Sequence, residues 1–192
     1  MSERMIKTGG LAGLLAAVLF VAATVAAQVV GNPDVYASSG NYLVQALNTA
    51  GYVAAIVAII DFYARLHRSR RFRRLGLVGA WLAGVGYAAM ALLTVANLVA
   101  GGRILVPVRI GAAVVLLVGS VILGIIVFAA RLLPWWCGVL LIVAFPLGDV
   151  ANELFAGSEG LLLALLWGTV GAGLLSRAAR PAERSPAQPA RV

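Results

Sequence analysis

The chain has 192 residues, of which 62% are hydrophobic and 11% are charged. An ordinary soluble domain carries roughly 25% charged residues, so this composition excludes a typical water-soluble fold. The net charge of +8 would suggest nucleic-acid binding on a soluble protein, but here the charges lie between apolar runs, and membrane topology explains them better. We therefore expect an integral membrane protein that has the lipid bilayer, and no nucleic acid, as its partner.

The sequence contains six apolar runs that could cross a membrane, which requires about 20 apolar residues per helix. The predicted helices cover residues 9–30, 41–65, 75–100, 104–130, 135–154 and 160–177. Breaker residues such as Gly31-Asn32-Pro33-Asp34 separate the runs. Residues 181–192 contain three prolines and little that could be buried, which predicts a disordered tail. The predicted fold is an all-α membrane bundle that forms one domain over residues 1–180.

The Lys and Arg residues predict the orientation, because cytoplasmic loops of membrane proteins are enriched in them. With six spans, most of the basic residues fall on one side: Arg4, Lys7, Arg65, Arg68, Arg70, Arg71, Arg73, Arg74, Arg131, Arg177, Arg180, Arg184 and Arg191. Arg103 and Arg109 fall on the other side. We therefore predict a multi-pass protein of the cell inner (plasma) membrane with both termini in the cytoplasm.

The loop between the second and third helices is strongly basic. Its arginines are expected to fix the topology and to attract the headgroups of anionic lipids; they are Arg68, Arg70, Arg71, Arg73 and Arg74. Asp61 and Arg65 lie four residues apart just before this loop. That spacing and order predict an ion pair at the membrane interface.

Polar side chains within the spans are costly in a bilayer and are therefore functional candidates. Helical spacing places several on shared faces: Thr24 with Gln28, Asn41 with Gln45, Asn48 and Tyr52, Tyr87 with Thr94 and Asn97, and Asp149 with Asn152 and Glu153. In the predicted topology nearly all lie in the outer half of the membrane. The candidate ligand-binding residues are Gln28, Gln45, Asn48, Asn97, Arg109, Asp149, Asn152 and Glu153.

Two interpretations of these residues remain open. The favoured one is interhelical hydrogen bonding in a dry interior, with Gln45, Asn97, Arg109 and Asp149 paired to one another. It predicts a non-enzymatic scaffold, accessory subunit or oligomer, either a homo-oligomer or part of a larger membrane complex. The alternative is a small-molecule binder or transporter with a polar vestibule open to the outer side, in which Asp149 or Glu153 opposes Arg109.

The sequence lacks the residues that several membrane chemistries require. The only lysine is Lys7, the only histidine is His67 in the basic loop, and the only cysteine is Cys137. Retinal attachment, bis-histidine haem ligation and a thiolate metal cluster each need residues that are missing here. We therefore expect no enzymatic activity, no cofactor and no metal site.

Small residues recur at the spacing that allows close helix contact: Gly9 with Gly13, Gly79 with Ala83, Ser120 with Gly124, and Gly168 with Ala172. The sequence does not say whether they pack within one chain or between subunits.

The run Leu133-Pro134-Trp135-Trp136-Cys137-Gly138-Val139-Leu140-Leu141 resembles a signature, Leu-Pro-x-Trp-x-Gly-x-Leu-Leu, of a broad group of uncharacterised bacterial multi-pass membrane proteins. Trp136 corresponds to the tryptophan of the signature, and the opening Gly10-Leu-Ala-Gly-Leu-Leu is similar to the start of that group. The resemblance implies a six-helix fold over most of the chain and implies no activity.

Overall fold

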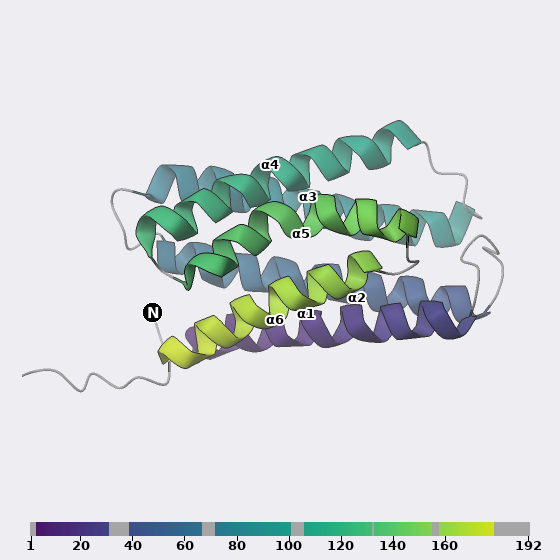
Figure 1. Cartoon of the computed structure of the whole chain (residues 1–192), viewed down its shortest axis with the longest axis horizontal. Coiled ribbons are helices and arrows are strands. Elements are labelled where there is room, and N and C mark those ends of the chain that lie inside the picture. Colours follow the sequence, from purple (N-terminus) through teal and green to yellow (C-terminus); the bar gives the residue numbers. More distant parts are fainter. Residues whose placement is uncertain are drawn as a thin grey trace, which may run out of the picture.

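The computed structural model describes residues 3–30, 39–66, 72–100, 106–131, 133–154 and 158–178. These residues form six helices: α1 (Glu3–Val30), α2 (Ser39–Leu66), α3 (Arg73–Ala100), α4 (Val106–Ala130), α5 (Trp135–Leu154) and α6 (Ser158–Ala178). Figure 1 shows that they lie alongside one another as an elongated bundle. The all-α prediction is therefore confirmed for the described residues. The predicted disordered tail, residues 181–192, lies outside them.

The helices have the length and surface of a multi-pass membrane protein. Within the described part of the chain, α1, α2, α3, α4 and α6 are long and apolar enough to cross a membrane, whereas the apolar stretch of α5 is shorter, Trp135–Gly148. Large apolar side chains are widely exposed, including Val18 at 64% and Leu92 at 70%. Soluble monomers rarely expose such extensive apolar surface, so this surface is suited to lipid.

The six helices form a closed ring. Each helix packs against its neighbours in sequence, α6 packs against α1, and α2 also touches α6 across the ring. Short connections between consecutive helices favour this order, because they leave each helix beside the next. The largest fully buried side chains include one from every helix: Phe20, Leu66, Tyr87, Leu116, Cys137 and Trp167. The core is therefore shared by all six helices.

Small residues bring neighbouring helices into backbone contact. A Cβ built on Gly13 of α1 would lie 3.0 Å from the Cα of Gly171 in α6, and one built on Gly124 of α4 would lie 2.7 Å from the carbonyl oxygen of Gly138 in α5. Gly79 of α3 likewise faces α4. Residues of this kind allow close helix approach in membranes. These positions, left ambiguous by the sequence, are used for packing within the chain.

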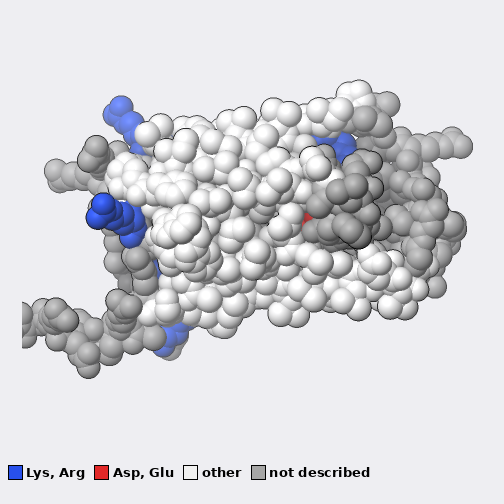
Figure 2. Space-filling model, in the orientation of Figure 1, with Lys and Arg blue, Asp and Glu red and all other residues white. Residues whose placement is uncertain are grey.

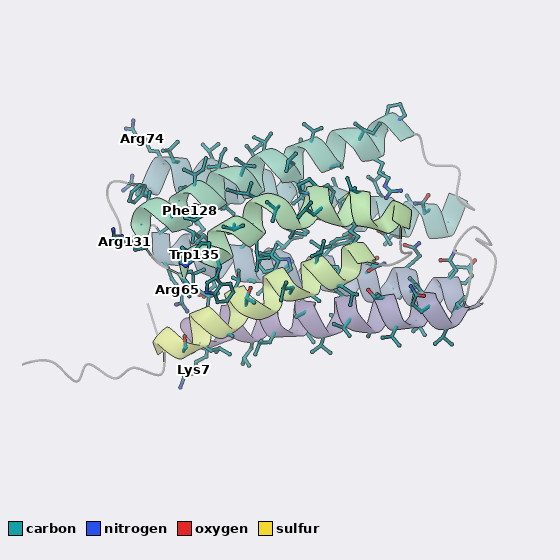
Figure 3. All side chains as sticks on the ribbon, viewed as in Figure 1. Lys7, Arg65, Arg74, Phe128, Arg131 and Trp135 are labelled. Atoms are coloured by element: carbon teal, nitrogen blue, oxygen red, sulfur yellow. The ribbon has the colours of Figure 1, made fainter. Side chains whose placement is uncertain are left out.

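The bundle has two chemically different ends. We call the end where α1 begins and α6 finishes the basic end, because the side chains of Lys7, Arg65, Arg74 and Arg131 lie there (Figure 3). Figure 2 shows blue side chains mainly at this left-hand end and a broad uncharged surface along the bundle. We call the opposite end, where α1, α3 and α5 finish, the far end. The expected segregation of basic side chains is thus present among the described residues.

Candidate functional site

A row of aromatic side chains crosses the interior of the bundle. The ring centroids of Phe20 in α1 and Tyr52 in α2 are 5.3 Å apart, and those of Tyr52 and Tyr87 in α3 are 5.9 Å apart. Trp167 of α6 approaches Tyr87 edge-on at 5.6 Å. All four side chains are buried, and edge-on aromatic contacts add to the stabilisation from burial. The row therefore ties four helices together at the centre of the bundle.

The last contact in this row includes a hydrogen bond. The indole Nε1 of Trp167 donates to the hydroxyl oxygen of Tyr87 at 3.1 Å, and each residue is only 2% exposed. A buried indole N–H needs such an acceptor, because leaving it without one is costly. Since α3 and α6 are not neighbours in the ring, this bond bridges the interior between helices whose backbones do not meet.

An acidic residue lies close to the aromatic row. Glu159, in the first turn of α6, is half-buried, and a Cβ built on Gly148 of α5 would lie 3.1 Å from its Cα. An acidic residue in the first turn is favoured by the helix dipole. The next residue, Gly160, packs against α1, since a Cβ built on it would lie 3.1 Å from the carbonyl oxygen of Phe20. An acidic side chain therefore lies close to the Phe20 end of the aromatic row.

The predicted ligand-binding residues that the structure describes lie toward the far end. Gln45, Asn48 and Asn97 are half-buried, whereas Gln28 and Arg109 are exposed. The shared face predicted on α2 does point inward, since Tyr52 is buried on it.

The scaffold interpretation predicts that Gln45, Asn97, Arg109 and Asp149 pair with one another. No hydrogen bond joins Gln45, Asn97 and Arg109 to one another, and Arg109 is exposed instead of lying in a dry interior. These three described residues are therefore not paired with one another. The side chains of Asp149, Asn152 and Glu153 lie outside the described residues, so the opposition of Arg109 by an acid stays a prediction.

Two of the polar residues predicted to share these faces are satisfied by their own helices. The hydroxyl of Thr24 donates to the carbonyl oxygen of Phe20 at 2.9 Å, and that of Thr94 donates to the carbonyl oxygen of Met90 at 2.8 Å. Threonine commonly bonds in this way within membrane helices. These hydroxyls therefore need no ligand to account for their presence.

A second polar cluster lies at the basic end. Asp61 and Arg65 form the predicted ion pair, with Arg65 Nε 3.3 Å from Asp61 Oδ2. Its position at the membrane interface stays a prediction, but Asp61 is only 6% exposed and Arg65 is 18% exposed, so neighbouring helices largely enclose the pair. The reason is Gly9 of α1, which packs so closely that an added Cβ would overlap the Asp61 side chain. The other carboxylate oxygen, Oδ1, is buried without a hydrogen-bond partner among the described residues.

Arg65 also contacts a third helix, α6. Its two terminal nitrogens donate to the carbonyl oxygen of Leu174 in α6 at 3.4 and 3.5 Å. Through Gly9, Asp61, Arg65 and Leu174, the cluster joins α1, α2 and α6.

The predicted lipid-headgroup arginines are only partly described. Arg73 and Arg74, at the start of α3, are exposed, and Figure 3 shows the Arg74 side chain extending away from the bundle. Arg68, Arg70 and Arg71 lie outside the described residues.

Apolar grooves run along the sides of the bundle. One of about 940 Å³ lies between α1, α2 and α6, and a smaller one of about 390 Å³ lies between α2 and α3. An interior void of about 10 Å³ is lined by Ile59, Phe62, Leu123, Leu133, Leu141, Trp167 and Val170.

The chain was compared with protein-family models, curated proteins and solved structures. None of these comparisons finds a match. The resemblance carried by residues 133–141 stays a prediction. Among the side chains that the structure describes, no three His, Cys, Asp or Glu residues gather into a group that could hold a metal ion.

Proposed function

We propose that the chain is a six-span protein of the inner (plasma) membrane, with the basic end in the cytoplasm, and that it acts as a non-enzymatic scaffold or accessory subunit. The gathering of basic residues at one end supports the orientation. The length of α5 supports a sixth crossing, since its 20 residues would extend for about 30 Å, the thickness of the hydrocarbon core.

The packed core between α2, α4, α5 and α6 supports the proposed role. Its void of about 10 Å³ is near the minimum that holds a single water, and its lining residues, including Ile59, Leu123 and Val170, offer that water no polar partner. The hydrogen bond between Tyr87 of α3 and Trp167 of α6 adds a contact across the centre of the bundle. Such a bundle is suited to presenting its outer surface and ends to other molecules.

Native mass spectrometry of the full chain, released from its membrane together with native lipids, tests this role. The proposal predicts a homo-oligomer, or a complex with another subunit in fixed stoichiometry. The ratio should persist as the collision energy rises to the point where loosely bound detergent is lost. A monomer that keeps no subunit under the mildest extraction would contradict the proposal.

A second candidate function is a small-molecule binder or transporter with a vestibule open to the outer side. The specific observation in its favour is that the half-buried amides of Gln45, Asn48 and Asn97 are not bonded to one another. Polar groups at membrane depth commonly face protein partners or water. Glu159 in the first turn of α6 and Arg109 in the first turn of α4 supply opposite charges at the far end.

Cysteine accessibility separates the two candidates. Asn97→Cys should react from outside with a membrane-impermeant thiol reagent if a water-filled vestibule exists. Val95→Cys, on an exposed apolar face of the same helix, is the matched control and should react slowly in lipid. Cys137 is fully buried, so the background should be low. Equal, slow reaction at both positions would exclude the vestibule, whereas fast reaction at Asn97→Cys would call for ligand screening with Arg109→Gln as the binding-defective variant.

A further inference from the structure

The smaller groove, between α2 and α3, has three features that together indicate its ligand: its volume, its length and two neighbouring arginines. It has a volume of about 390 Å³ and is lined by residues between Ile56 and Tyr63 on α2 and between Leu77 and Ala88 on α3. This volume lies within the range of about 300–1,000 Å³ typical of small-molecule sites. At Gly84, which lines the groove, an added Cβ would find no atom within 4 Å. The missing side chain therefore leaves space that another molecule can fill.

The length of the groove matches one leaflet of a bilayer. Its lining on α3 runs from Leu77 to Ala88, which at 1.5 Å per helical residue is about 16 Å. The hydrocarbon core of a bilayer is about 30 Å thick, so the groove extends through about half of it. Because Leu77 lies near the start of α3, this is the half next to the basic end.

Two arginines lie one helical turn beyond the groove lining on α3. Arg73 and Arg74 are exposed and precede Leu77 by one helical turn, the spacing that places residues on one face. The carboxylate of Asp61, at the same end of α2, is held by Arg65 and is buried. Arginine binds phosphate through paired hydrogen bonds, and basic groups at a membrane surface attract anionic lipids.

The larger groove lacks this charge. Among the described residues, no Lys or Arg lies within one helical turn of its lining, which includes Val25 and Leu47, and Arg109 lies on α4, which contacts neither α1 nor α2. The smaller groove is therefore distinguished by its position beneath two arginines.

We propose that the groove between α2 and α3 binds one anionic phospholipid from the leaflet at the basic end. One acyl chain occupies the groove over Gly84, and the phosphate is held by Arg73 and Arg74. The exposed ring of Trp81, which lines the groove, packs against the chain. The proposal requires that the bundle lies in a membrane, but it does not depend on the scaffold role.

Lipid retention in native mass spectrometry tests the proposal on the purified full chain. Phosphatidylglycerol and phosphatidylcholine with identical acyl chains are titrated separately into delipidated protein. We expect one phosphatidylglycerol to be retained at a concentration roughly tenfold lower than phosphatidylcholine, because two arginines favour the anionic headgroup. The double variant Arg73→Gln/Arg74→Gln should lose this preference. The control variant Lys7→Gln/Arg131→Gln also removes two positive charges at the basic end, but away from the groove. It should keep the preference for phosphatidylglycerol.

A second pair of variants tests the groove itself. Gly84→Leu adds a side chain at a position where its Cβ meets no other atom within 4 Å, and it should lower the retention of both lipids. Gly111→Leu is the matched control, because Gly111 also has no atom within 4 Å of an added Cβ but lies on α4. Leucine favours helix over glycine, so both variants should fold, as circular dichroism would verify.

Three results would overturn the proposal. Retention unaffected by Gly84→Leu would mean that the lipid binds elsewhere. An equal loss of preference in both charge variants would mean nonspecific attraction to the basic end. A dimer that Gly84→Leu dissociates would make the groove a subunit contact.

Discussion

Replacing Arg65 with glutamine should destabilise the bundle by removing the partner of a buried carboxylate. Asp61 is 6% exposed and Arg65 is 18% exposed, so little solvent is available to compensate the remaining charge. Because breaking a buried ion pair typically costs ~3–5 kcal/mol and Arg65 retains some exposure, we expect a loss of about 3 kcal/mol. The substitution also removes the hydrogen bonds to the carbonyl oxygen of Leu174. The effect should therefore extend to the contact between α2 and α6.

Reversible unfolding in mixed micelles with increasing sodium dodecyl sulfate, followed by circular dichroism, measures this effect. The control is the double variant Asp61→Asn/Arg65→Gln, which removes both charges. Since the cost of the single variant comes mainly from the unpaired carboxylate, the double variant should recover at least about 1 kcal/mol relative to Arg65→Gln. If the double variant is no more stable than the single one, the buried-charge explanation is refuted.

Two further predictions concern packing and use the same unfolding measurement. Tyr87→Phe keeps the ring but removes the acceptor of the Trp167 N–H, so it should cost about 1–2 kcal/mol. In a double-mutant cycle with Trp167→Phe, the coupling should be about 0.6–1.7 kcal/mol, and zero coupling would argue against the bond. Gly119→Leu should prevent α3 and α4 from packing, because an added Cβ would overlap the backbone of the facing helix. Gly111→Leu, which has open space, should be nearly neutral, and equal behaviour of the two variants would contradict the observed helix contact.

The helices and the charge segregation could be predicted because both are local properties of the sequence. Apolar runs of about 20 residues are the direct requirement for spanning a bilayer, and basic residues concentrate in alternate loops. The inward face of α2 was also predictable, because the 3.6-residue period places Gln45 and Tyr52 together. Each of these inferences depends on residues within one helix.

Contacts between helices were much less predictable. The spacing of Asp61 and Arg65 indicates a pair, but its burial depends on Gly9, more than fifty positions earlier in the sequence. The bond between Tyr87 and Trp167 joins residues 80 positions apart, and only closure of the ring brings them together. One signal was present in the sequence, since Trp167 lies in the middle of an apolar run, whereas tryptophan in membrane proteins is enriched at the interfaces. A tryptophan in that position indicates a buried partner for its N–H.

The central claim is that the chain crosses the membrane six times with the basic end in the cytoplasm, and labelling of single introduced cysteines in intact cells tests it most directly. Pro107→Cys lies in the first turn of α4, Arg131→Cys follows α4, and Ala156→Cys lies between α5 and α6. We predict that an impermeant maleimide labels Pro107→Cys and Ala156→Cys from outside, and labels Arg131→Cys only after the cells are permeabilised. Labelling of Arg131→Cys and Ala156→Cys from the same side would show that α5 does not cross, and would contradict the account.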